Sequence, residues 1–307
     1  MLCPPVFCTS ITSRISFQAS RTSFHIFRNC LFNRSFSDRN TQTKQQEDDV
    51  HFFGFEKVSS SEKRQRVQSV FSNVAAKYDL MNDIMSGGIH RFWKDYFIHR
   101  LAPTAGTKLL DVAGGTGDIA FRFLKAVERV SPEFSEMQNH PESHVTVLDI
   151  NANMLSICKT RAEEIGACNC KSLACIQGNA EKLPFADHTF DAYTIAFGIR
   201  NVVHIEEALA EAMRVLRPGG RFLCLEFSEV RNPTFNRMYH WYSQEIIPVL
   251  GELVAGDWKS YQYLVESIQK FPNQEDFGQM IKEAGFRAVT HENLFNGIAA
   301  IHSAYKL

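Results

Sequence analysis

The stretch from Leu109 to Ala120 constrains the fold of this chain more than any other, because it joins an apolar run to a helical segment through three closely spaced glycines. The apolar run that ends at Asp111 predicts a buried strand, and Ile119 opens a helix. The glycines permit a tight turn and let a ligand approach the backbone. The start of a helix adds unpaired N–H donors. We therefore predict a nucleotide-type binding turn in an α/β fold.

Two cofactor classes compete for this turn. Residues 115–120 satisfy the dinucleotide pattern G-x-G-x-x-[GA], which places a pyrophosphate at the positive end of the helix. Asp118 at the helix entrance would repel a pyrophosphate, and with Asp111 it suits a ligand that carries amino and sulfonium cations, such as S-adenosylmethionine. Asp149 ends the next strand and fits the ribose hydroxyls of either cofactor. After a third strand, Asn179 places an amide where it suits an adenine edge.

The segment from Arg214 to Leu223 closes a helix with a Pro-Gly-Gly turn and opens another strand, which decides for S-adenosylmethionine. The chain then alternates as a doubly wound sheet should. Expected strands lie near 108–113, 144–150, 172–177, 190–197 and 221–228, with helices near 117–129, 152–165 and 204–216. The segments 286–292 and 297–305 have hairpin character.

At this point the chain resembles class I methyltransferases, and within them the ubiquinone/menaquinone biosynthesis C-methyltransferase family. The likeness runs from about His51 to Leu307, and its most specific parts are Tyr78–Asp79 and Phe197–Asn201. The matching segments are 71–83, 88–94, 111–118, 197–201 and 225–228. The resemblance implies a Rossmann-like, doubly wound seven-stranded sheet with an antiparallel last strand and an N-terminal helical cover.

The resemblance also implies S-adenosyl-L-methionine as cofactor, with Thr116 in the glycine turn, Asp149 on the ribose and the Asn179-Ala180 pair near the adenine. Where bacterial relatives have Ser before Phe-Gly, this chain has Ala196, so a hydroxyl contact is lost there. No metal is expected. The full set of expected cofactor residues is Asp111, Gly114, Thr116, Gly117, Asp149, Asn179 and Ala180.

The activity that the family implies is C-methylation of a 2-methoxy-6-polyprenyl-1,4-benzoquinol ring in ubiquinone biosynthesis. Loss of a phenolic proton makes a ring carbon nucleophilic, so the site needs a base and an anion stabiliser. Arg200 is our candidate for holding the phenolate, since arginine stays protonated and is no base. Alternatively, Arg200 pairs with Asp79 or Glu226. Proton-acceptor candidates, which the sequence cannot rank, are Tyr78, Asp79, His90, His204 and Glu226.

The first residues differ in composition from the rest. Residues 1–37 contain four arginines and seven serines but no acid, which is typical of a mitochondrial presequence. We expect a transit peptide over 1–36, a disordered linker over 37–50 and a methyltransferase domain over 51–307. Within the domain we expect a helical cover over 51–101, a surface insertion over 131–144 and a substrate-side helical cover over 233–271.

Composition limits the partners of the 307-residue chain. With 44% hydrophobic residues, 22% charged residues and a net charge of −1, it lacks the basic balance of a nucleic-acid-binding protein. No apolar run reaches 18 residues, so membrane contact on the matrix side of the inner membrane would be peripheral. The aromatic stripe in 233–271 fits a core, a homodimer face or a cover over a prenylated quinol.

Three other functions remain open. An NAD-linked oxidoreductase rests only on the G-x-G-x-x-A match. A non-catalytic S-adenosylmethionine-binding scaffold of the ubiquinone-biosynthesis enzymes shares every cofactor motif. A demethylmenaquinone methyltransferase is disfavoured by the presequence alone. The family also implies an assembly with other enzymes of the pathway.

Overall fold

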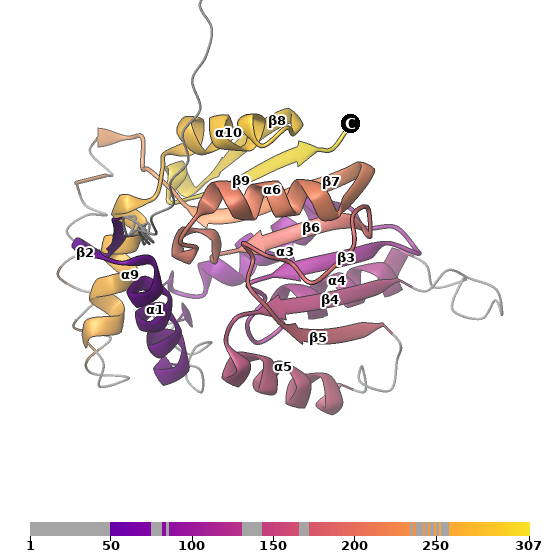
Figure 1. Cartoon of the computed structure of the whole chain (residues 1–307), viewed down its shortest axis with the longest axis horizontal. Coiled ribbons are helices and arrows are strands. Elements are labelled where there is room, and N and C mark those ends of the chain that lie inside the picture. The colour runs from indigo at the N-terminus through magenta and orange to yellow at the C-terminus, as the bar shows by residue number, and fades with distance from the viewer. Residues whose placement is uncertain are drawn as a thin grey trace, which may run out of the picture. The chain divides into compact units, whose positions relative to one another are not determined.

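A seven-stranded sheet runs through the centre of the domain (Figure 1). The computed structural model describes residues 50–74, 82–83, 86–130, 143–165, 172–233, 236–237, 242, 245, 249, 252 and 258–307. The strands of the sheet are β3 (Lys108–Val112), β4 (His144–Asp149), β5 (Leu173–Gln177), β6 (Phe190–Ala196), β7 (Leu216–Phe227), β8 (Arg287–Leu294) and β9 (Ala299–Tyr305).

The strand order β5-β4-β3-β6-β7-β9-β8 confirms the expected doubly wound fold. Strands β3 to β7 pair in parallel, whereas β9 is antiparallel to both β7 and β8. The chain leaves β3 toward β4 on one side and later returns to its other side with β6. This change of direction creates a switch point, and ligands of open α/β sheets bind outside the carboxyl ends of the strands at such a point.

Helices cover both faces of the sheet, because the side chains of each strand alternate between two cores. On β7, Phe222 and Cys224 belong to one core, and Leu223 and Leu225 to the other. The first core is completed by α6 (Ile205–Val215) and α10 (Gln274–Glu283), and the second by α3 (Ile89–Leu101), α4 (Asp118–Val130) and α5 (Ala152–Glu164).

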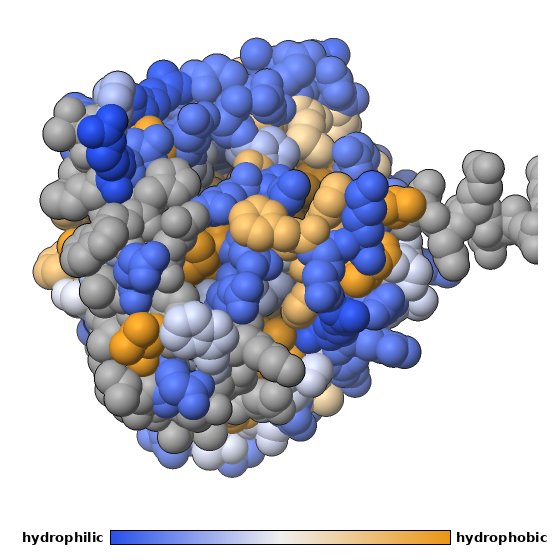
Figure 2. Space-filling view, turned by 90° about the vertical axis from the view of Figure 1, so that its left-hand side faces the viewer, coloured by the Kyte–Doolittle hydropathy of each residue, from blue (hydrophilic) through white to orange (hydrophobic). Residues whose placement is uncertain are grey.

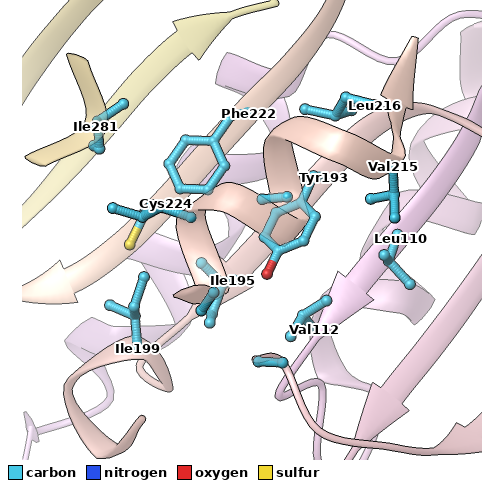
Figure 3. Close-up of a cluster of buried hydrophobic side chains, with 14 of the residues drawn as sticks. Leu110, Val112, Tyr193, Ile195, Ile199, Val215, Leu216, Phe222, Cys224 and Ile281 are labelled. Atoms are coloured by element: carbon cyan, nitrogen blue, oxygen red, sulfur yellow. The ribbon is translucent and has the colours of Figure 1, made fainter. Parts of the chain in front are cut away.

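Figure 3 shows the first core, in which the ring of Tyr193 lies beside that of Phe222. The ring centroids are 5.5 Å apart and the rings are stacked. Aliphatic side chains from β3, β6 and α6 surround this pair, among them Leu110, Ile195 and Val215. The rigid packing fixes the ends of β3 and β6, from which the loops of the switch point begin.

The expected cover over 51–101 is not helical throughout. Residues 51–58 form a hairpin of β1 (His51–Phe53) and β2 (Glu56–Val58), which turns at Gly54 with a φ of +60°. The ring of Phe53 stacks on Tyr263 of α9 (Trp258–Lys270), with centroids 4.1 Å apart. The prediction of a helix is wrong for residues 51–58, because a contact with a residue far away in the chain stabilises the hairpin.

The rest of that cover contains α1 (Ser60–Val74) and α3, whereas residues 75–81 and 84–85 lie outside the described part of the chain. Residues 1–49, with the expected transit peptide and most of the linker, also lie outside it, as do 131–142 of the expected insertion. Of the expected cover over 233–271, α9 is described as a helix. The short helices η3 (Ile199–Asn201) and η5 (Phe295–Gly297) complete the elements.

The remaining strand and helix predictions hold to within two residues at each end, except at the start of β7. That strand begins at Leu216 and not near 221, because the Pro-Gly-Gly turn forms an irregularity within it: Phe190 pairs with Leu216, and Ala192 with Arg221. The expected terminal hairpin is confirmed by β8 and β9. In the ranges that the structure describes, no helix has the length and apolarity to cross a bilayer.

Candidate functional site

A pocket lies at the switch point, against the carboxyl ends of β3, β4 and β6. The glycine turn lines it from Asp111 to Thr116, and residues 148–151 and 178–181 line it from the next two strands. Helix α1 lines the pocket with Arg64, Val67, Gln68 and Phe71. Figure 2 views the face that carries α1 and α9, where hydrophobic side chains show between hydrophilic ones.

The glycines of the turn have different roles. A Cβ on Gly114 would lie 2.8 Å from both Asp111 Oδ2 and Val147 Cγ1, so this glycine packs against the protein itself. Gly117, with a φ of +84°, would place a Cβ 2.5 Å from Cys158 Sγ and is not among the lining residues of the pocket. Gly117 therefore packs against α5, and the expectation that it lets the cofactor approach stays a prediction. Gly115 is open, because its nearest neighbour would be Asp149 Oδ2 at 4.0 Å.

The turn presses against the loop that follows β6. Ala113 and Phe197 both have positive φ, of 50° and 56°, although neither is glycine. A Cβ on Gly198 would lie 2.5 Å from that of Ala113, so only glycine lets the two loops meet. Such backbone conformations cost free energy and are found mainly where a site requires them.

Asp111 is buried beneath the pocket, with 1% of its surface exposed. Its Oδ1 accepts a hydrogen bond of 2.9 Å from Thr194 Oγ1, whereas Oδ2 has no partner among the described residues. Burial raises the pKa of this carboxyl to about 7, against the lowering effect of Thr194. An acid with one unused oxygen beside a pocket fits a ligand that brings a cation.

Asp149 is held by backbone amides. Its Oδ2 accepts from Gly115 N at 2.9 Å and its Oδ1 from Asn151 N at 2.8 Å. Burial raises its pKa, and these amide hydrogen bonds oppose the shift. The carboxylate is thus fixed at the end of β4 and lines the pocket, with further lone pairs available to a diol.

Thr116 is buried and lines the pocket, but its side chain is engaged. Arg161 of α5 donates from Nη1 to Thr116 Oγ1 at 3.0 Å. Asn179 and Ala180 also line the pocket, and Asn179 Oδ1 accepts from the amide of Glu181 at 3.1 Å. The structure therefore brings the expected adenine-side residues to the pocket, with the amide oxygen of Asn179 partly used in its own turn.

Asp118 does not carry the free negative charge that its position at the helix entrance suggests. Lys94 Nζ lies 2.7 Å from its Oδ2, and Arg122 pairs with its Oδ1. Burial would raise the pKa of Asp118, but these two cations outweigh it, so the pKa is lowered. Because Lys94 and Arg122 neutralise it, Asp118 neither repels a pyrophosphate nor attracts a cation as the sequence argument requires.

Arg200 and Glu226 form a buried ion pair, with Nη1 and Oε1 2.8 Å apart and 4% and 2% of their side chains exposed. Arg200 Nη1 also donates to the carbonyl of Phe197 at 2.6 Å, and its guanidinium lies 5.4 Å from the ring of Phe227. Burial raises the pKa of Glu226, and Arg200 opposes that rise. Of the two pairings considered from the sequence, the one with Glu226 is present. Neither residue is among those that line the pocket.

The other proton-acceptor candidates do not gather at one point. Tyr78 and Asp79 lie outside the described residues. His90 is buried, its Nδ1 lies 2.7 Å from Ser86 Oγ, and burial lowers its pKa to about 4. His204 Nδ1 lies 3.3 Å from Glu181 Oε2.

Sequence reasoning missed the contacts that hold α1 over the pocket. Glu181 pairs with Arg64 at 3.1 Å and accepts from the amide of Val203 at 3.0 Å. Asn151 caps α5 and donates from its side chain to Ser72 Oγ at 3.0 Å. An Asn between a strand and a helix is a readable N-cap signal, whereas its link to α1 has no local signature.

Comparisons with known proteins find close sequence relatives of this chain and solved structures with a similar fold. The chain is 56% identical to the mouse protein named 2-methoxy-6-polyprenyl-1,4-benzoquinol methylase, mitochondrial, over 83% of this chain and 84% of that protein. The Arabidopsis thaliana protein of the same name is 55% identical over 83% of this chain and 90% of its own length. A crystal structure of a SAM-dependent methyltransferase from Thermotoga maritima has a TM-score of 0.51 and 16% identity, and covers 78% of this chain and 99% of that one.

The fold, the pocket at the switch point and the close relatives all indicate a methyltransferase. Residues 59–306 match one methyltransferase family along nearly the whole described domain. The chain belongs to the ubiE/COQ5 methyltransferase family.

Proposed function

We propose that this chain transfers a methyl group from S-adenosylmethionine to a ring carbon of a 2-methoxy-6-polyprenyl-1,4-benzoquinol. The observation that carries the proposal is the pocket at the switch point, which Asp111 and Asp149 reach from the ends of two adjacent strands. The names of the relatives supply the substrate class. The same names support a mitochondrial protein that acts in ubiquinone biosynthesis.

The residues of the pocket fit the cofactor. Asp149 would hold the ribose hydroxyls, and Asn179 with Ala180 would contact the adenine. Thr116 would contribute its donors, the backbone N–H and the hydroxyl O–H, since its carbonyl and its hydroxyl oxygen both accept from Arg161. The unused oxygen of Asp111 suits the cationic end of the ligand. When bound, S-adenosylmethionine supplies a methyl group made electrophilic by its sulfonium.

Arg200 would stabilise the phenolate. Its Nε–H is buried and has no acceptor among the described residues, so we assign this donor to a phenolate oxygen. Glu226 accepts from Arg200 Nη1 and from the amide of Phe227 at 2.9 Å, so we assign it the positioning of the guanidinium. Tyr78 remains our candidate proton acceptor. The aromatic rings of Phe197 and Phe227, 4.8 Å apart, supply an apolar surface beside Arg200.

The cellular setting belongs to the same proposal. We infer import by residues 1–36 and peripheral contact with the matrix side of the inner membrane. We also infer that the protein assembles with other ubiquinone-biosynthesis enzymes and forms a homodimer. The polyprenyl chain of the substrate is apolar and poorly soluble in water, which favours contact of the enzyme with a membrane or a partner protein.

The test is transfer of labelled methyl to a short-chain 2-methoxy-6-prenyl-benzoquinol under reducing conditions. Wild type should place the label on a ring carbon, Asp149→Asn should lose cofactor affinity, and Arg200→Gln should bind cofactor but transfer slowly. Arg129→Gln, at an exposed position of α4, is the matched control. Cofactor binding without transfer, even when the partner enzymes are added, would favour the scaffold function instead.

A further inference from the structure

Lys94 of α3 is a buried cation at the edge of the pocket. Only 6% of its surface is exposed, and it is among the residues that line the pocket. An ammonium has three N–H donors. Among the residues that the structure describes, Lys94 donates only to Asp118. A buried ammonium beside a pocket therefore keeps donors for a ligand.

Lys94 shares its ion-pair partner with a second cation. Asp118 is shared between Lys94 and Arg122, so one carboxylate faces two cations. Arg122 reaches a second carboxylate, Asp95, at 2.7 Å, but 64% of that side chain is exposed and solvent screens it. Since Asp118 is divided between two cations, the remaining N–H donors of Lys94 can be taken by an anionic ligand group.

The same part of the pocket offers the opposite charge nearby. Asp111 lines the pocket, and its Oδ2 lacks a partner among the described residues. The two side chains interact electrostatically, since Lys94 lowers the pKa of Asp111 against the effect of burial. Free donors on a cation and a free oxygen on an acid match the two charged groups of an amino acid.

We propose that Lys94 binds the α-carboxylate of the methionine part of the cofactor while Asp111 faces its α-ammonium. This inference rests on the proposed use of S-adenosylmethionine and assigns a specificity-determining residue within that site. Lys94 would then distinguish ligands that carry the carboxylate from adenosyl ligands that lack it. The alternative is an ion pair that only fastens α3 to α4, which would affect all ligands of the pocket alike.

The experiment compares three ligands by calorimetry on the full chain. S-adenosylmethionine carries the carboxylate and the ammonium, its decarboxylated form lacks only the carboxylate, and 5′-methylthioadenosine lacks both. We expect Lys94→Met to weaken the binding of S-adenosylmethionine about 10- to 100-fold, as for the loss of a charge-assisted hydrogen bond. The affinities for the other two ligands should change less than about threefold. Lys94→Arg should restore most of the loss, and Lys125→Met, exposed on α4, should change nothing.

The outcomes separate this inference from the proposed function. Equal weakening of all three ligands by Lys94→Met, or no weakening of any, would overturn the role of Lys94 while the cofactor assignment stands. Failure of wild type to bind any of the three would overturn the cofactor assignment and the role of Lys94 together. Thermal melting of each variant without ligand shows whether it is folded, and Lys94→Arg retains the cation if Lys94→Met does not fold.

Discussion

Replacing Asp111 with asparagine is expected to change how the stability of the unliganded protein depends on pH. The carboxyl is fully buried, and burial raises its pKa from 3.8 to about 7. Because this pKa is higher in the folded than in the unfolded protein, the acid contributes most to stability below about pH 4. That contribution is lost as the pH rises from about 4 through 7.

The magnitude follows from the shift. A change of about three pKa units corresponds to about 4 kcal/mol, or about 1.4 kcal/mol for each pH unit between the two pKa values. Asparagine cannot ionise, so Asp111→Asn removes this slope. Its amide retains the bond from Thr194 but places an N–H₂ group where Oδ2 has no partner, at a cost of about 1–3 kcal/mol at every pH. The variant should therefore be less stable than wild type near pH 4 and more stable by about 1–3 kcal/mol at pH 8.

Urea unfolding of both proteins from pH 5 to 8 measures the difference directly. The free energy of unfolding of Asp111→Asn relative to wild type should rise by about 2 kcal/mol from pH 5 to 7 and level off above about pH 8. Asp95→Asn, on a side chain that is 64% exposed, is the control and should show no such rise. A difference that stays constant from pH 5 to 8 would refute the reasoning, because it would mean that burial does not penalise the ionised form of Asp111.

Two further substitutions and one alkylation experiment test the packing around the site. Glu226→Gln should cost about 3–5 kcal/mol of stability in urea unfolding, since it leaves the Arg200 charge buried without its partner, and a loss under about 1 kcal/mol would contradict this. Gly117→Ala should cost more than about 2 kcal/mol, because its φ is +84° and its Cβ would meet Cys158 Sγ at 2.5 Å; an unchanged urea midpoint would show that the loop adapts. Cys175 should be alkylated faster than Cys158 at pH 7, because Cys158 is fully buried whereas Cys175 is partly exposed; equal rates by peptide mass spectrometry would argue against it.

Much of the fold follows from local patterns. The strand and helix ranges of the sheet are predictable because each element buries a face with its own period, 2 for strands and 3.6 for helices. The hairpin at 51–58 is not, since its stacking partner Tyr263 is about 200 residues away in the chain. The start of β7 is not predictable either, because the Pro-Gly-Gly turn forms an irregularity inside the strand, across which the pairing with β6 shifts register.

The sequence by itself determined the glycine turn, the acids at the ends of β3 and β4, and hence the kind of pocket that the chain can form. These features depend on neighbouring residues, whose spacing the backbone fixes. The tertiary structure alone decided which charges are free. Lys94 neutralises Asp118 and Glu226 holds Arg200, across 24 and 26 positions of the chain, whereas Asp111 Oδ2 has no partner in the described part of the chain. Electrostatic energy depends on separation and burial, and both are set only when distant segments pack together.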